Sequence, residues 1–94
     1  MQDYVLPSET KLFSNYPNPF NPTTTIKYQL KEPGFVTLKV YDILGKEVAS
    51  LVNENEGAGY YKVNFDANNL SSGFYIYRLR VNNYVESKKM LLTK

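Results

Sequence analysis

The sequence predicts an all-β domain, an antiparallel β-sandwich of about seven strands. Aromatic residues make up 15% of the 94-residue chain, and most segments alternate apolar with polar residues, which favours sheet over helix. Turn-forming residues separate these segments at the spacing of a sandwich, and the length fits one domain with a thin core. The expected strands cover residues 12–14, 23–30, 35–41, 46–52, 60–65, 74–81 and 84–92.

A proline-rich segment, Asn15–Pro22, precedes the first long strand and is called the proline strap below. It holds three prolines, three asparagines and two aromatic residues. Each proline fixes its own φ and favours extended geometry in the residue before it, so the strap is expected to be stiff. Disordered linkers are poor in aromatics, and Tyr16 and Phe20 therefore indicate that the strap docks onto something. Two interpretations stay open: a rigid loop that seals one end of the domain, or a recognition element.

The segments on either side of the strap are read from composition and periodicity. Residues 1–10 are polar and aperiodic, and are interpreted as a linker to an upstream domain. In 23–30 and 35–41 alternate residues are apolar, and Lys31–Gly34 has the composition of a turn, so an antiparallel hairpin is expected. The inward side chains are expected to be Ile26, Tyr28, Leu30, Val36, Leu38 and Val40.

The middle of the chain contains one ambiguous stretch. Asp42–Gly45 indicates a turn, and the apolar residues at positions 44, 48, 51 and 52 fit both a strand and a helical stripe. A strand over 46–52 is favoured because Gly45 would interrupt the helix and the neighbouring segments have period two. A loop rich in Asn, Glu and Gly is expected over 53–59.

The last third of the chain predicts a strand, a long connection and a closing hairpin. Residues 60–65 place Tyr61, Val63 and Phe65 on one face, and a polar connection follows over 66–73. Asn82-Asn83 suits the tight turn between 74–81 and 84–92, and Tyr75, Tyr77, Leu79 and Val81 are expected to point inward. Leu70 and Tyr75 resemble the corner of immunoglobulin-like folds, where a tyrosine hydroxyl ties a loop to a strand.

Composition excludes several function classes. Cysteine and histidine are absent, which removes thiolate and imidazole chemistry and the usual zinc sites. The carboxylates stand in polar turns or on wet strand faces, and Asp66-x-Asn68-Asn69 lacks the spacing of a calcium loop. A formal charge of +2 is too small for nucleic-acid binding, and no apolar run could span a membrane. We expect no enzyme activity and no cofactor.

Other residues have two interpretations each. Exposed Tyr60 or Tyr84 could stack on sugar rings, although tyrosines on sheet faces are common. Lys88-Lys89 could be recognised by a partner or could protect an edge strand. Residues 1–10 lack the features of a signal peptide, which fits a cytosolic chain or a fragment of an exported one.

Four sequence blocks follow one another along the chain: Tyr16–Pro22 (YPNPFNP), Val40–Val48 (VYDILGKEV), Leu70–Tyr75 (LSSGFY) and Lys88–Leu92 (KKMLL). In this order they resemble one known family, the type A C-terminal sorting domain of the bacterial type IX secretion system. The resemblance runs from about Lys11 to Lys94 and implies a sorting domain over 11–94, with the linker to an upstream cargo over 1–10.

The resemblance implies a non-catalytic signal that takes an exported cargo across the periplasm to the cell surface or medium. Its implied partners are an outer-membrane translocon, a sortase-like cysteine protease that removes the domain in or before residues 1–10, and the cargo domain of the same precursor. The implied recognition residues are Pro17, Asn18, Pro19, Phe20, Gly45, Gly73, Tyr75, Lys88 and Lys89. The alternative is a carbohydrate-binding or spacer sandwich of a secreted hydrolase.

Overall fold

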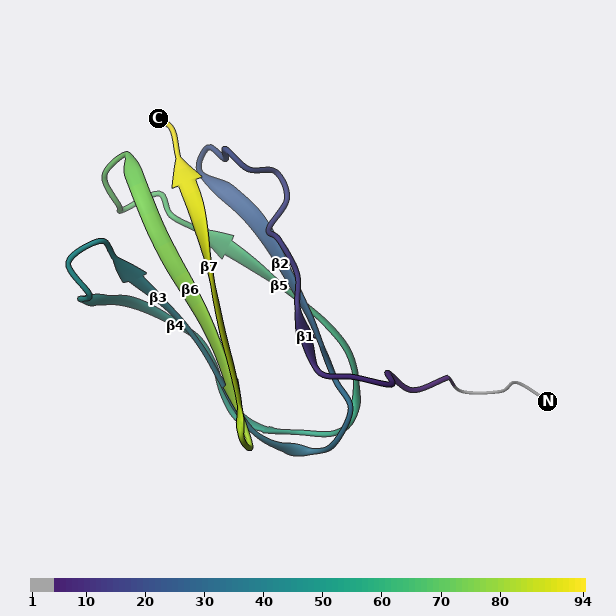
Figure 1. Cartoon of the computed structure of the whole chain (residues 1–94). Coiled ribbons are helices and arrows are strands. Elements are labelled where there is room, and N and C mark those ends of the chain that lie inside the picture. The colour runs from purple at the N-terminus through teal and green to yellow at the C-terminus, as the bar shows by residue number, and fades with distance from the viewer. Residues whose placement is uncertain (1–4) are drawn as a thin grey trace.

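The computed structural model describes residues 5–94 and confirms the all-β prediction, with seven strands and no helix in that part of the chain (Figure 1). The predicted strands are all present, and most of their bounds agree within two residues of the expectation. The strands are β1 (Lys11–Leu12), β2 (Thr23–Leu30), β3 (Gly34–Asp42), β4 (Glu47–Glu56), β5 (Gly59–Asp66), β6 (Gly73–Val81) and β7 (Tyr84–Leu92).

The strands form two antiparallel sheets, a three-stranded sheet in the order β1-β2-β5 and a four-stranded sheet in the order β4-β3-β6-β7. The predicted hairpin over 23–41 is wrong: β2 pairs with β1 and β5, while β3 belongs to the other sheet. Residues 31–33 therefore cross between sheets. Alternation shows which face of a strand is buried, but it does not show which strand lies beside it.

The core lies between the two sheets and is built from the alternating residues that the sequence indicates. The predicted inward residues of β2, β3 and β6 are buried, while Tyr61 and Val63 of β5 are partly buried against the core. The largest fully buried side chains include Tyr28, Tyr77 and Phe20. Because a buried tyrosine hydroxyl needs a partner, these tyrosines also determine polar contacts between the sheets.

Two tyrosines connect the sheets by hydrogen bonds. Tyr77 of β6 donates to the carbonyl of Phe13 at 2.7 Å, and Tyr28 of β2 donates to Oε1 of Glu56 on β4 at 2.6 Å. Burial raises the pKa of Tyr77 to about 12. Burial likewise raises the pKa of Tyr28. Burial also raises the pKa of Glu56, although the hydrogen bond from Tyr28 acts to lower it. Both hydroxyls are therefore neutral donors at physiological pH.

The ambiguous stretch is a strand, as favoured, and β-bulges explain its helix-like pattern. Leu38 pairs with Val52 and Lys39 with Ser50, so Leu51 is an extra residue, and a second shift leaves Val48 extra. Each bulge breaks the period of two, and both extra residues pack against the core. The loop expected over 53–59 is wrong, because β4 continues to Glu56, paired with Gly34 at the start of β3, and leaves only residues 57–58 as the turn.

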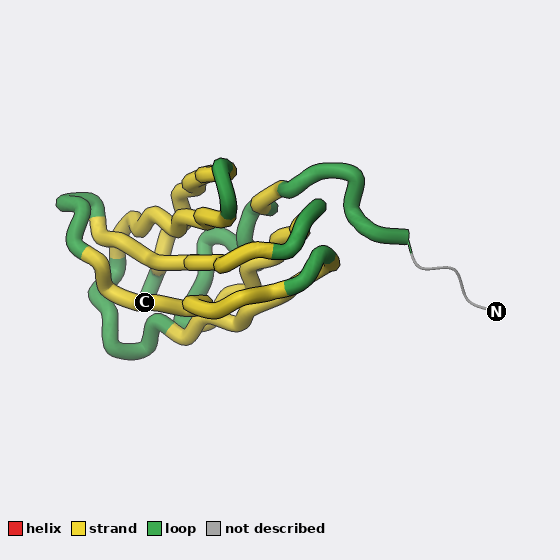
Figure 2. Tube along the Cα trace, turned by 90° about the horizontal axis from the view of Figure 1, so that it is seen from below, coloured by secondary structure: helices red, strands yellow, loops and turns green. Residues whose placement is uncertain are grey.

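The antiparallel arrangement gathers the connections at two ends of the sandwich. One end, called the strap end, holds residues 13–22, 43–46, 67–72 and 93–94, because the chain enters β2, β4 and β6 and leaves β7 there (Figure 1). The opposite end, called the linker end, holds residues 31–33, 57–58 and 82–83 and the segment that precedes β1. Figure 2 shows this segment leaving the body of the sandwich.

The segment before β1 makes two contacts with β2 and the residue after it. Gln29 Nε2 donates to the carbonyl of Glu9 at 2.9 Å, and the Lys31 amide donates to Oγ1 of Thr10 at 3.0 Å. Residues 1–4 of the expected linker lie outside the described residues. The linker over 1–10 stays a prediction.

Candidate functional site

The proline strap docks along the open edge of β7. Phe20 forms a parallel bridge with Leu92: its amide donates to the carbonyl of Leu91 at 3.0 Å, and its carbonyl accepts from the Thr93 amide at 2.9 Å. Asn18 Oδ1 accepts from the Leu91 amide at 3.0 Å. The first and last predicted blocks therefore form one surface.

Two buried side chains, Phe20 and Asn15, anchor the strap to the sandwich. The Phe20 ring is 2% exposed and lies 6.2 Å from the Phe65 ring, centroid to centroid. The buried Asn15 donates to Thr24 Oγ1 at 3.0 Å and to the carbonyl of Pro17 at 3.2 Å, and the same carbonyl accepts from Thr24 at 2.8 Å. Pro17, Asn18 and Pro19 remain exposed above these anchors. The strap therefore seals the sandwich and presents a fixed polar and proline surface.

Gly45 shapes the turn between β3 and β4, at the strap end. Its φ is +87°, and a Cβ at this position would meet no atom within 4 Å, so glycine is required by backbone conformation and not by space. The Asp42 carboxylate accepts from the amides of Leu44 and Lys46, each at 2.9 Å. This short, closed turn holds its apex in one conformation.

The apex of this turn carries two apolar side chains that sequence reasoning did not single out. Ile43 is 71% exposed and Leu44 is 90% exposed. Turns are usually polar, and adjacent exposed aliphatic side chains at a rigid apex are typical of a contact surface. The sequence feature that could have indicated this surface is the apolar pair between the turn-forming residues Asp42 and Gly45.

Gly73 and Tyr75 form the predicted tyrosine corner beside the C-terminus. The Tyr75 hydroxyl donates to the carbonyl of Ser71 at 2.6 Å, which confirms the interpretation of Tyr75 as a corner tyrosine. Gly73 has a φ of +149°, a conformation that glycine tolerates at the start of β6. Next to this corner, the Lys94 amide donates to Ser72 Oγ at 3.0 Å, and Lys94 Nζ donates to the carbonyl of Asn68 at 2.6 Å.

Lys88 and Lys89 point to opposite faces of β7 and have different surroundings. Lys88 lies on the inward side and forms an ion pair with Glu86 at 3.5 Å. Lys89 lies on the outer face, with its Nζ 4.9 Å from the centroid of the Phe74 ring, a cation–π contact. The two residues therefore do not form one dibasic patch.

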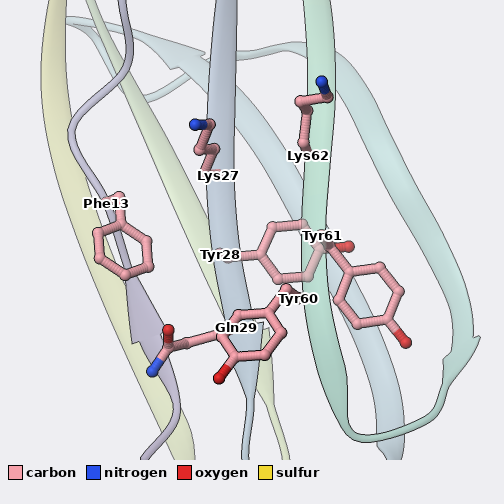
Figure 3. Close-up of a pocket in the computed structure, with 7 residues that line it drawn as sticks. All are labelled: Phe13, Lys27, Tyr28, Gln29, Tyr60, Tyr61 and Lys62. Carbon is pink, nitrogen blue, oxygen red and sulfur yellow. The ribbon is translucent and has the colours of Figure 1, made fainter. Parts of the chain in front are cut away.

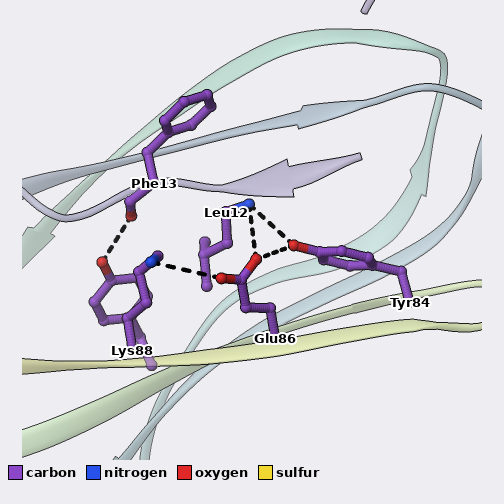
Figure 4. Close-up of polar contacts among 6 residues, drawn as sticks. Leu12, Phe13, Tyr84, Glu86 and Lys88 are labelled. Carbon is purple, nitrogen blue, oxygen red and sulfur yellow. Dashed lines mark hydrogen bonds and ion pairs between the residues drawn. The ribbon is translucent and has the colours of Figure 1, made fainter. Parts of the chain in front are cut away.

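Glu86 is the centre of a polar cluster that attaches β1 to β7 (Figure 4). Its carboxylate accepts from the Tyr84 hydroxyl and, at 3.4 Å, from the Leu12 amide, which also donates to the Tyr84 oxygen at 3.2 Å. The Tyr84 hydrogen bond lowers the pKa of Glu86, with the Leu12 amide and Lys88 acting in the same direction. Burial raises the pKa of Tyr84 to about 12. Tyr84 is half-buried, and its hydroxyl is already hydrogen-bonded to Glu86 and the Leu12 amide. Both facts weaken its interpretation as a sugar-stacking residue.

Metal clusters and membrane-spanning helices are absent from the described part of the chain. Residues 5–94 contain no cluster of acidic residues that could hold a metal ion, and no helix in this part of the chain is long and apolar enough to cross a membrane. Asp66, considered above as a calcium ligand, accepts from the Asn68 amide at 2.9 Å and so closes a turn.

The fold, the corner tyrosine and the anchored strap define an immunoglobulin-like β-sandwich domain with a rigid surface at one end. The family model described as the secretion system C-terminal sorting domain matches residues 14–93, and the chain belongs to this family. The resemblance to the type IX sorting domain is confirmed, and the domain is a C-terminal sorting signal of type IX secretion. No curated protein matches the chain.

Proposed function

We propose that the strap end is the surface by which an outer-membrane translocon recognises the folded domain, and that a sortase-like cysteine protease then separates the domain from its cargo. The single observation that supports this proposal is that the strap, the Ile43–Leu44 turn, the tyrosine corner and the C-terminus lie at the same end of the sandwich. These segments are far apart in the sequence, and only the folded domain brings them together. A receptor that binds this end would therefore select folded domains.

The proposed recognition residues divide into residues that contact the receptor and residues that hold the surface in place. Side chains that are exposed at or near the strap end are proposed as contacts: Pro17, Asn18, Pro19, Ile43, Leu44 and Lys89. Residues that are buried, or whose backbone or polar contacts fix the surface, are proposed as supports: Phe20, Gly45, Gly73, Tyr75 and Lys88. A rigid surface binds with little loss of conformational entropy, which favours recognition of a folded signal.

The linker end is suited to proteolytic separation. The segment before β1 leaves the sandwich at the end opposite the strap (Figure 2), so an upstream cargo on this segment would not cover the proposed receptor surface. Exposed segments that precede a compact domain are accessible to proteases. We place the cleavage site in or before residues 1–10.

A fusion experiment tests the sorting function. The chain is attached behind a signal peptide and a fluorescent cargo, and expressed in a host with the type IX machinery and in a mutant host that lacks it. We expect surface or extracellular fluorescence only when the machinery is present. Delivery in both hosts, or in neither, would contradict the proposal.

A pair of variants tests the position of the receptor surface. Ile43→Ser/Leu44→Ser removes the exposed apolar apex and should reduce export strongly without lowering the melting temperature, since neither side chain is buried. Phe35→Thr is the matched control, because Phe35 is 52% exposed and lies near the linker end. Equal export by both variants, or equal loss of export, would place the receptor surface elsewhere.

A further inference from the structure

The outer face of the β1-β2-β5 sheet carries a shallow groove that is lined by none of the residues proposed as receptor contacts (Figure 3). The groove has a volume of about 690 Å³, and its lining includes Phe13, Lys27, Gln29, Tyr60 and Lys62. A second groove of about 510 Å³ shares Phe13 and both lysines and extends the surface to Tyr16. Together they form a continuous depression, called the sheet groove below.

The sheet groove is positively charged and has no neutralising partner on its own strands. Lys27 and Lys62 lie directly opposite each other in the β2–β5 register, an arrangement that costs stability because the charges are alike. Within residues 5–94 neither lysine forms an ion pair. The one carboxylate at an outward position of the three strands is Asp66, at the far end of β5. The groove is therefore complementary to an anion.

Aromatic rings lie on both sides of the lysine pair. Tyr60 is 62% exposed and Tyr16 is 81% exposed, and Phe13 lies beside Lys27, whose carbonyl accepts from the Phe13 amide at 3.0 Å. An exposed aromatic face can stack on the apolar face of a sugar ring. In Figure 3 the Tyr60 ring lies beside Gln29 and below the two lysines.

The sheet face favours a saccharide over a peptide. β2 is paired with β5 along its whole length, so an added peptide strand would pair at the open edge of β5, beside the groove, and would not lie across Lys27 and Lys62. The face presents only side chains, and these include acceptors and donors suited to hydroxyl and carboxylate groups. Gln29 Nε2 donates to the carbonyl of Glu9, and its Oε1 can accept from a sugar hydroxyl.

We propose that the sheet groove binds an acidic polysaccharide, with sugar rings stacked on Tyr60 and Tyr16 and sugar carboxylates bound by Lys27 and Lys62. The centre of the groove, at Lys27, Lys62 and Tyr60, lies on the sheet face and contains none of the proposed translocon contacts, whereas its far end at Tyr16 borders the strap. Substitutions at the lysine pair or at Tyr60 should therefore remove saccharide binding without changing the proposed translocon contacts.

The test measures binding of the whole chain to polygalacturonate by calorimetry, with dextran as a neutral saccharide and poly-glutamate as an acidic peptide. We expect binding to polygalacturonate that weakens with salt, and no binding to dextran. Tyr60→Ala should weaken affinity about tenfold, since loss of one stacking contact of this kind is worth a factor of that order. Lys27→Gln/Lys62→Gln should abolish binding while leaving the melting temperature unchanged or raised, because it removes the like-charge pair.

The matched control is Lys31→Gln/Arg80→Gln, which makes the same change of charge at two exposed residues that line neither groove and lie outside the strap end. This variant should keep full affinity for polygalacturonate and wild-type export. Three results would overturn the proposal: equal loss of affinity in the control, unchanged affinity in Tyr60→Ala, or no binding of polygalacturonate. Tighter binding of poly-glutamate than of polygalacturonate would also overturn it and assign the groove to an acidic peptide.

Discussion

At the residue scale, the Tyr75 hydroxyl ties the connection between β5 and β6 to strand β6. It spans four residues back to the Ser71 carbonyl, next to the Ser72 and Asn68 groups that hold Lys94. Tyr75→Phe removes only this hydrogen bond and should lower the free energy of unfolding by about 1 kcal/mol. Urea unfolding measures this change, with Tyr60→Phe as the control at an exposed tyrosine. If both variants are equally stable, the corner bond contributes nothing to stability.

Glu86 gives the domain a predicted acid sensitivity. Its pKa in the folded state is lowered from 4.5, chiefly by the Tyr84 hydrogen bond. A carboxylate with a depressed pKa stabilises the fold above its unfolded pKa, and this contribution is lost as pH falls through the folded value. The difference in stability between the wild type and Glu86→Gln should therefore be larger at about pH 6 than at about pH 3. Urea midpoints at both pH values test this, and an equal difference at the two would refute it.

At the element scale, the strap covers the end of β7, the edge strand of the four-stranded sheet. Asn18→Ala removes the acceptor of the Leu91 amide at a cost below about 1 kcal/mol. Hydrogen exchange at Leu91 should become faster, while exchange in the β3–β6 ladder stays unchanged. Asn55→Ala, at an exposed position of β4, provides the control. Unchanged exchange at Leu91 would show that backbone contacts of Phe20 alone protect the edge.

The elements also show where sequence reasoning succeeds and where it fails. Periodicity located every strand because one face of each is buried against the same core. Periodicity failed to predict the partner of β2, since a crossover and a hairpin have the same local pattern. It also failed to predict the length of β4, where pairing with β3 outweighs the polar composition of residues 53–56. The contact of Phe20 with Leu91 joins distant segments, and no local rule predicts which edge a rigid strap will cover.

At the scale of the whole molecule, the two ends of the sandwich have separate tasks. The segment before β1 leaves at the linker end, while Thr93 and Lys94 are held within the strap end by Phe20, Ser72 and Asn68. A cargo on the N-terminal side therefore leaves the proposed receptor surface open. An extension beyond Lys94 would start inside that surface.

This asymmetry predicts different effects of extending the two ends. A flexible Gly/Ser tail added after Lys94 should abolish export, because it occupies the space above the strap and the Ile43–Leu44 turn, whereas the same tail inserted before Val5 should be tolerated. The melting temperatures of both variants should match that of the wild type, since the backbone bonds of Thr93 and Lys94 do not require a free terminus. Surface fluorescence of the fused cargo measures export. Efficient export with the C-terminal tail would move the receptor surface away from the strap end, toward the sheet faces.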